Sequence, residues 1–153
     1  KFKDQFWDSD VQYYYTVAKE TGRWPVWMNY RTFSKEKILM GLCMGDYAKK
    51  ADLMSTEELI EDGLKVLKNV WEDDVGEVQN VLRTSWLNDP FTKGAYSFPR
   101  VDNSEEDFEN LAESVDNRLF FCGEHTDLEY LATTHGALFT GIRAAKEVIK
   151  ANK

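Results

Sequence analysis

The sequence of 153 residues lacks the features of several classes of protein. It has no run of about 18 apolar residues, so no transmembrane helix is predicted, and it shows no charged-then-apolar leader typical of a signal peptide. The first residue is Lys1 rather than Met, and it leads directly into an apolar stretch. We therefore expect the chain to be cut at its amino terminus, and this leaves targeting open.

Basic clusters and cysteines are also scarce. The 19 basic residues are outnumbered by 27 acidic ones, which gives a net charge of −8. Since phosphate binding needs clustered Lys and Arg, we expect no direct contact with nucleic acid; a cationic ligand is compatible with this charge. Cys43 and Cys122 each lie in an apolar run. They are predicted to be core thiols rather than a disulfide or metal pair, which favours a reducing intracellular compartment, cytoplasmic or nuclear.

The nine glycines do not form a nucleotide-binding fingerprint. Such a fingerprint has the spacing G-x-G-x-x-G after a strand. The nearest candidate, at residues 41–45, has the wrong spacing. No dinucleotide site is therefore predicted from glycine spacing.

The first 45 residues favour antiparallel β-structure. Aromatic and β-branched residues predict strands at 12–17, 25–30 and 38–42, separated by polar breaks. Short connections between consecutive strands favour a meander. Residues 2–6 have the composition of the middle of a further strand.

Helical periodicity then replaces the β pattern. Ser55 with Glu58 forms a capping-box signature, and the apolar residues behind it predict a helix over 56–72. A strand is predicted at 79–86. A short acidic helix is predicted at 104–114, with its inward residues being Phe108, Leu111 and, just beyond it, Val115.

The last 36 residues predict a strand, a loop and a helix. Residues 118–123 are almost wholly apolar, as in a strand buried on both faces of a parallel sheet. The final helix is predicted to begin near Thr134. Its expected buried residues are Leu138, Ile142, Ala145 and Ile149. The combined pattern is that of parts of two domains, one α+β with antiparallel strands and one α/β.

The loop before the last helix has the chemistry of a ligand site. A first turn of Thr-Thr-His-Gly at 133–136 offers free backbone N–H groups and a partial positive charge, with small residues that allow close approach. Glu124, at the end of the apolar run, could accept hydrogen bonds from hydroxyls of a sugar or ribityl chain. On these residues alone, a capped surface helix after a core strand remains the alternative.

Residues 119–126 (LFFCGEHT) and 132–138 (ATTHGAL) with Gly141 resemble the carboxy-terminal flavin-binding signature of the flavin-containing amine oxidases. Residues 85–91 (SWLNDPF) and 94–97 (GAYS) are similar to a second segment of that family, and residues 6–8 to the end of a strand in its substrate domain. The similarity favours the branch of polyamine oxidases and lysine-specific histone demethylases.

This resemblance implies a domain organisation. Residues 1–85 would belong to the substrate-binding domain, with antiparallel strands and helices. Residues 86–153 would form the carboxy-terminal strand–loop–helix of a Rossmann-like FAD-binding domain and a wall of the flavin pocket. The cofactor implied is FAD, and no metal site is implied.

The resemblance also implies roles for particular residues. Glu124 would hydrogen-bond the ribityl or pyrophosphate part of FAD. Thr133 and Thr134 would offer backbone N–H groups to the pyrimidine edge of the flavin, where positive charge stabilises the anionic reduced form. Trp86 would pack near the ring, and Tyr96 would stand on the substrate side of it. Some relatives carry a second Tyr where this chain has Thr133, which points away from monoamine oxidases.

The histidines are given no catalytic role, and the two aromatic residues have a structural alternative. Trp86 and Tyr96 would otherwise be core aromatics. His135 is interpreted as a helix-start residue, and His125 could be a packed loop residue.

The implied reaction is oxidation of a C–N bond in a small amine or methyl-lysine peptide, with release of hydrogen peroxide. The family's pyrophosphate fingerprint and its flavin-facing lysine would precede Lys1. We therefore expect the missing amino-terminal part to be a required partner, and the fragment alone to be inactive.

Two alternatives remain open. One is another flavin oxidoreductase with the same carboxy-terminal unit, such as a desaturase-like or porphyrinogen-oxidising enzyme; the aromatic block at 86–96 argues against it. The other is a catalytically silent scaffold whose acidic helix face meets a basic partner. That face comprises Glu57, Glu58, Glu61 and Asp62, and a solvated helix face explains it more simply.

Overall fold

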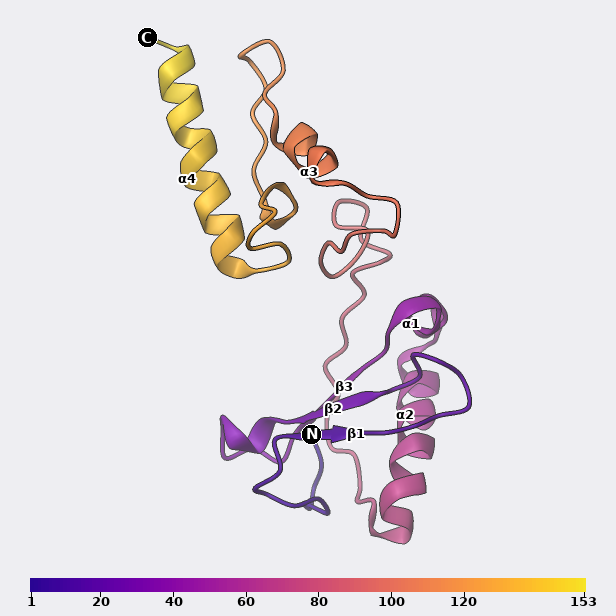
Figure 1. The fold of residues 1–153 in the computed structure, drawn as a ribbon. Coiled ribbons are helices and arrows are strands. Elements are labelled where there is room, and N and C mark those ends of the chain that lie inside the picture. Colours follow the sequence, from indigo (N-terminus) through magenta and orange to yellow (C-terminus); the bar gives the residue numbers. More distant parts are fainter. The chain divides into compact units, whose positions relative to one another are not determined.

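The computed structural model describes all 153 residues and contains two compact units, Lys1–Pro90 and Phe91–Lys153 (Figure 1). Each unit is described by itself below. Three antiparallel strands and four α-helices make the chain α+β. None of the helices is both long and apolar enough to cross a membrane.

The first unit contains the predicted antiparallel meander. Its strands are β1 (Tyr13–Tyr15), β2 (Val26–Asn29) and β3 (Leu39–Leu42), and they are hydrogen-bonded in the order β1-β2-β3. Tyr14 lies opposite Trp27, and Trp27 lies opposite Gly41. Since side chains alternate across a strand, these three positions share the face that enters the core.

Two helices follow the sheet. Helix α1 (Gly45–Leu53) was not predicted, because it offers only Tyr47 and Ala51 as buried residues and so has a weak apolar pattern. Helix α2 (Thr56–Trp71) confirms the predicted helix. Its capping box is present: the Glu58 N–H donates to Ser55 Oγ at 3.1 Å, and the Ser55 N–H donates to Glu58 Oε2 at 2.7 Å.

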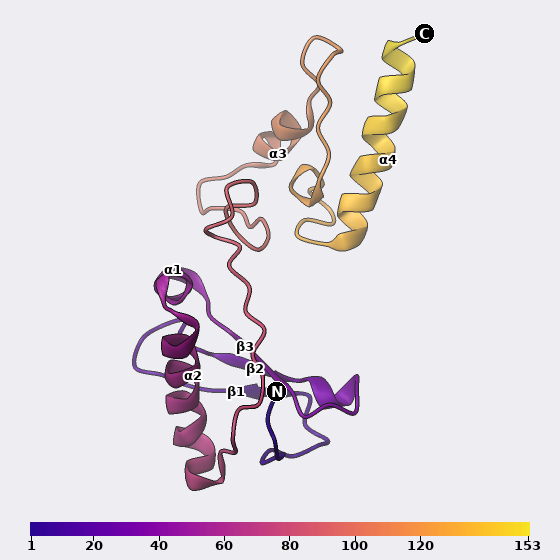
Figure 2. The same ribbon diagram turned by 180° about the vertical axis from the view of Figure 1, so that it is seen from behind.

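The core of the first unit lies between the sheet and α2, which lie next to each other in Figure 1 and Figure 2. Val66 and Leu67 of α2 are each only 1% exposed. The rings of Trp24 and Trp27 stack with their centroids 5.1 Å apart. Burial of these large apolar surfaces supplies the main driving force for folding of this unit.

The predicted strands at 2–6 and 79–86 are not formed. Phe2 makes a single antiparallel bridge to Val78, and the Gln79 N–H donates to the Lys1 carbonyl at 2.8 Å. Residues 79–85 form no regular secondary structure and belong to no sheet. Their composition suits a strand, but pairing also needs a neighbouring strand, and the unit provides none beside them.

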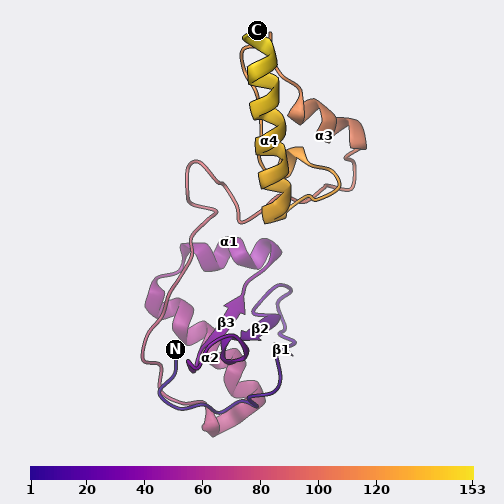
Figure 3. The ribbon, with the colours of Figure 1, turned by 90° about the vertical axis from the view of Figure 1, so that its left-hand side faces the viewer.

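The second unit contains α3 (Glu105–Ala112), the one-turn 3-10 helix η3 (Glu124–Thr126) and α4 (Thr134–Ala151). Figure 3 shows α3 and α4 together in this unit. Both helices confirm predictions. The expected inward positions are only partly correct, because Phe108 is half-buried while Leu111 and Val115 are 51% and 48% exposed.

The predicted buried strand at 118–123 is wrong. The segment makes one bridge, between Val115 and Leu119, and its Leu119 and Phe121 side chains are 59% and 40% exposed. Cys122 is exposed, so its assignment as a core thiol is also wrong, whereas Cys43 is half-buried; both are free thiols. The reason is again pairing, since no strand of this unit lies on either side of the segment.

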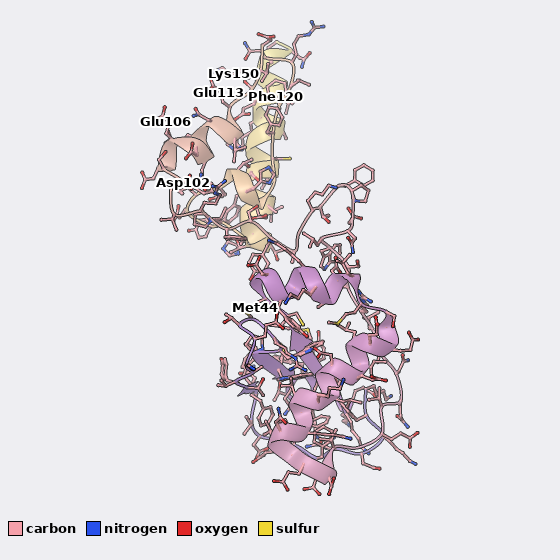
Figure 4. The ribbon with its side chains drawn as sticks, turned by 90° about the vertical axis from the view of Figure 1, so that its right-hand side faces the viewer. Met44, Asp102, Glu106, Glu113, Phe120 and Lys150 are labelled. Atoms are coloured by element: carbon pink, nitrogen blue, oxygen red, sulfur yellow. The ribbon has the colours of Figure 1, made fainter.

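Helix α4 buries a different face from the one predicted. Its buried residues are Gly136, Thr140 and Ala144. The predicted inward residues are exposed, namely Leu138, Ile142, Ala145 and Ile149. Phe120 and Lys150 of this unit are labelled in Figure 4. The Phe121 carbonyl accepts from Arg143 Nη2 at 3.2 Å, and the Gly123 N–H donates to Thr140 Oγ1 at 3.0 Å. The segment 121–123 therefore runs along the small, polar face of the helix and covers it.

Candidate functional site

The first turn of α4 is held open by its N-cap, Thr133. Thr133 has extended backbone angles, and its Oγ1 accepts from the Gly136 N–H at 3.0 Å. The same hydroxyl donates to the Tyr130 carbonyl at 2.6 Å. The backbone N–H groups of Thr134 and His135, the first two residues of α4, have no acceptor within the chain, and neither has that of Thr133, for which the same role was predicted. The turn thus presents two free donors and the positive end of the helix dipole, as an anionic or electron-rich ligand requires.

Gly136 allows the loop to reach this position. A Cβ atom at Gly136 would lie 2.3 Å from the Tyr130 carbonyl oxygen, so any other residue would push the loop away from the helix. The Tyr130 ring in turn contacts the His135 ring edge-on, with centroids 4.8 Å apart. His135 also contacts Phe139. His135 is therefore an exposed helix-start residue in contact with two aromatic rings, and its position agrees with the sequence interpretation.

Glu124 lies between two loops of the second unit. Its Oε1 accepts from the Ser97 N–H at 3.1 Å, and its Oε2 accepts from the Ala132 N–H at 2.7 Å. Ser97 is the neighbour of Tyr96, and Ala132 is the neighbour of Thr133. A single carboxylate thus joins the segment that carries the predicted substrate aromatic to the loop that opens α4.

The backbone before Glu124 has a conformation that requires glycine. Gly123 has φ +138°, and a Cβ atom there would lie 2.6 Å from the His125 ring. Glycine adopts such angles without steric cost. The turn directs the Glu124 side chain toward the amides of Ser97 and Ala132.

The two predicted aromatics are both solvent-exposed rather than part of a core. Tyr96 is 66% exposed in the second unit, and Trp86 is 49% exposed in the first. The alternative that they are core aromatics is therefore wrong for this structure. The second unit brings Glu124, Thr133, Thr134 and the Tyr96–Ser97 segment together, while Trp86 belongs to the first unit.

The Trp86 segment is anchored by a residue that sequence reasoning missed, Arg83. Its guanidinium donates to the carbonyls of Ala51 at 3.1 Å, of Asp52 at 2.8 Å and of Met54. These carbonyls lie at the end of α1, where a cation is favourable; that of Ala51 also accepts from the Met54 N–H at 3.2 Å. The Asn88 N–H donates to Asp52 Oδ2 at 3.1 Å, so the turn that carries Trp86 is fixed on both sides.

Arg143 was also missed, and it performs the equivalent task in the second unit. It donates from Nη1 to the Ala112 carbonyl at 3.2 Å and from Nη2 to the Phe121 carbonyl at 3.2 Å and to Thr126 Oγ1 at 3.1 Å. The arginine therefore ties α3, the extended segment and η3 to α4. An exposed lysine or arginine on a helix is so common that periodicity gave no signal for this role.

The acidic helix face considered as a docking surface is smaller than its sequence suggests. Asp62 does not face solvent: its side chain is 15% exposed and pairs with Arg23, with Nη2 and Oδ1 2.6 Å apart. Trp24 Nε1 donates to Asp62 Oδ2 at 2.7 Å, and the Tyr47 hydroxyl donates to the same oxygen. Asp62 is thus a structural residue of the first unit, and only Glu57, Glu58 and Glu61 remain on the exposed face.

Comparison with known proteins agrees with the chemistry of the loop and helix. The family model for flavin containing amine oxidoreductase matches residues 1–149. The chain belongs to this family. The match spans both compact units, so the first unit, which has no flavin signature of its own, is part of the same amine oxidoreductase sequence.

Two relatives show which amine oxidoreductases this chain is similar to. Lysine-specific histone demethylase 1 homolog 2 of rice (Oryza sativa subsp. japonica) is 33% identical over 99% of this chain. Protein FLOWERING LOCUS D of Arabidopsis thaliana is 33% identical over 97% of it. The chain spans about a fifth of the length of these relatives, 21% and 20% respectively.

Proposed function

We propose that this chain is the carboxy-terminal part of an FAD-dependent amine oxidase that acts on a polyamine or an N-methyl-lysine-like amine. The observation that carries the proposal is the first turn of α4, where two free backbone N–H groups lie next to a loop fixed by Glu124. Family membership and the named demethylases support the flavin and the amine.

The residues present fit the flavin. The free amides of Thr134 and His135 suit the electron-rich pyrimidine edge of the ring, and the helix dipole favours negative charge there. Bound FAD would supply the redox chemistry, namely removal of a hydride equivalent from the carbon beside the amine and transfer of electrons to oxygen, which gives hydrogen peroxide. The chain's own contribution is to bind, orient and polarise.

Glu124 has two tasks in this proposal. Its carboxylate already accepts from two backbone amides, and each oxygen keeps a further lone pair for a ribityl hydroxyl. Ribityl binding would therefore add to the existing contacts without breaking them.

Tyr96 and Trp86 would supply aromatic surface. Tyr96 is 66% exposed and Trp86 49% exposed. An aromatic face attracts an amine through its π electrons and packs against a flat ring. Thr133, which caps α4 where some relatives carry a second aromatic, would leave room beside Tyr96 for a longer amine.

The rest of the same protein would complete the enzyme. The chain has neither a glycine fingerprint for the pyrophosphate nor an assigned flavin-facing lysine, and it spans about a fifth of its relatives. We propose that both features reside elsewhere in the full-length protein, and that the 153-residue chain alone has no oxidase activity. The intracellular location expected from the two free thiols stays a prediction.

The test is spectroscopic and uses the full-length protein. The purified protein should be yellow, and under anaerobic conditions its flavin absorbance should bleach with spermine or with a dimethyl-lysine peptide. A colourless protein would refute the proposal. A yellow protein that neither amine bleaches would assign the chain to another flavin oxidoreductase.

A backbone substitution tests the helix terminus. Thr134→Pro deletes one of the two free N–H groups, yet proline is well tolerated at the first position of a helix, and Thr133 already has the extended angles that precede proline. The rate of anaerobic bleaching should fall by about tenfold, because one hydrogen bond to the negatively charged reduced flavin is lost. Thr134→Ala keeps the N–H and is the matched control, expected to behave like the natural protein.

A further inference from the structure

Thr140 is a buried residue in the second turn of α4, and its side-chain hydroxyl hydrogen-bonds a segment that is distant in sequence. The residue is 3% exposed. Its Oγ1 accepts from the Gly123 N–H at 3.0 Å and lies within donating distance of three carbonyls: those of Gly136 and Ala137, each at 3.0 Å, and that of Gly123 at 3.1 Å. A threonine in a helix commonly bonds its own preceding turn, but the bond from Gly123 has no such local explanation.

The Gly123 contact lies directly before Glu124. The Gly123 N–H donates to the Thr140 hydroxyl, and the Gly123 carbonyl is one of the three acceptors that can receive its single proton; Gly123 has the φ +138° conformation that turns the chain into η3. The Thr126 N–H also donates to the Gly123 carbonyl, at 3.0 Å. The direction in which the Glu124 side chain leaves the backbone is thus set by α4.

The contacts continue from Glu124 to both sides of the site. Glu124 accepts from Ser97 on one side and from Ala132 on the other. A chain of hydrogen bonds therefore runs from the second turn of α4, through Gly123 and Glu124, to the Tyr96 segment and back to the first turn of the same helix. Such a connected set of hydrogen bonds, partly buried at Gly123 and Ser97 and exposed at Ala132, can hold two loops in one arrangement.

We propose that Thr140 is a positioning residue that acts through Glu124, fixing the Tyr96–Ser97 segment and the loop at Ala132 relative to each other. The expected effect of Thr140 on flavin binding rests on the proposed function. The expected effect of Thr140 on the two loops is independent of that function. Thr140 is only 3% exposed and would act without touching a ligand, and its hydroxyl rather than its methyl group would carry the effect.

The experiment uses three variants of the full-length protein. Thr140→Val keeps the shape and removes the hydroxyl, Thr140→Ala removes it with a residue that favours helix, and Thr140→Ser keeps it. Peptides containing residues 97 and 132 should exchange their amide hydrogens about fivefold faster in the Val and Ala variants, as expected for one lost hydrogen bond. The Ser variant should exchange at the natural rate. Unchanged exchange in the Ala variant, or equal acceleration in the Ser variant, would overturn the inference.

Flavin binding supplies the second readout. The Val and Ala variants should bind FAD about fivefold to tenfold more weakly, and Ser should restore the natural affinity. In a Glu124→Ala background the Thr140 substitutions should add almost nothing, because residues that act through one another are not additive. Additive losses would contradict a path through Glu124. If the natural protein binds no flavin, the proposed function fails, and the amide exchange still decides the role of Thr140.

Discussion

Replacing Asp62 by asparagine tests whether one carboxylate organises the first unit. Asp62 accepts from Arg23 Nε at 3.1 Å and Nη2 at 2.6 Å, from Trp24 Nε1 at 2.7 Å and from the Tyr47 hydroxyl. An asparagine side chain would have one acceptor oxygen for these donors, and its NH₂ group would face another donor. We therefore expect Asp62→Asn to destabilise the protein strongly.

The size of the expected loss of stability follows from the hydrogen-bond partners of Asp62. Hydrogen bonds to a charged group contribute about 1.5–3 kcal/mol each, and loss of one partner of a buried ion pair costs about 3–5 kcal/mol. The Arg23 side chain is 25% exposed, so water compensates part of the loss. The expected decrease in the free energy of unfolding is about 3 kcal/mol.

The contribution of Asp62 to stability depends on pH in a defined direction. Burial alone raises the pKa of Asp62, but the hydrogen bonds from Arg23, Tyr47 and Trp24 outweigh it, so that the pKa lies below its ordinary value. A carboxylate with a lowered folded-state pKa stabilises the protein above its unfolded pKa of about 3.9, and this stabilisation is lost as pH falls through the folded value. Asp62→Asn should therefore lose less stability than the natural chain as the pH falls from about 5 to below about 3.

Urea denaturation followed by tryptophan fluorescence measures both effects, because Trp24 is a partner of Asp62 and stacks on Trp27. Glu61→Gln is the matched control: it changes the same charge at the adjacent, exposed position of α2 and should alter stability by less than about 0.5 kcal/mol. A loss of less than about 1 kcal/mol for Asp62→Asn would refute the assigned role.

Three further outcomes are expected. Arg83→Met should cost about 1–2 kcal/mol in urea denaturation, because the carbonyls at the end of α1 lose their donor; a neutral result would show that water replaces the guanidinium. Thr133→Ala should cost about 1 kcal/mol by removing the N-cap of α4, seen as faster amide exchange in the first turn of that helix and nowhere in α2. Burial raises the pKa of the Cys43 thiol to about 11, whereas Cys122 is exposed, so a disulfide reagent at neutral pH should modify Cys122 rapidly and Cys43 slowly; equal rates would contradict the burial of Cys43.

Local signals in the sequence predicted the elements that are stabilised locally. The Ser55 capping box defined the start of α2, and the Thr-Thr-His-Gly turn defined the start of α4. The meander was predictable because its strands are consecutive and need only short connections. Each of these depends on residues close together in the chain.

Elements that depend on distant partners were not predictable. Residues 79–86 and 118–123 have the composition of strands, but a strand needs a neighbour to bond with, and composition does not show whether one is present. The buried face of α4 was misassigned for a related reason. The segment at 120–123 covers Thr140 through hydrogen bonds, a preference that apolar periodicity does not register.

The residues of the candidate site also fall into a group that the sequence predicted and a group that it did not. Glu124, Thr133 and Thr134 were found because they lie in contiguous segments with recognisable chemistry. Arg83, Thr140 and Arg143 act at long range on backbone carbonyls and amides, which every residue has. Since any segment can offer such groups, no sequence pattern identifies the partner.

The exposed apolar residues of α4 affect how this chain behaves in solution. Leu138, Ile142 and Ile149 are 61%, 46% and 59% exposed and recur at helical spacing. At low ionic strength the net charge of −8 keeps copies of the chain apart. Added salt screens that repulsion over about 8–10 Å and leaves the apolar stripe free to pair. The colloidal stability of the isolated chain should therefore fall with rising salt, the reverse of a protein that associates through opposite charges.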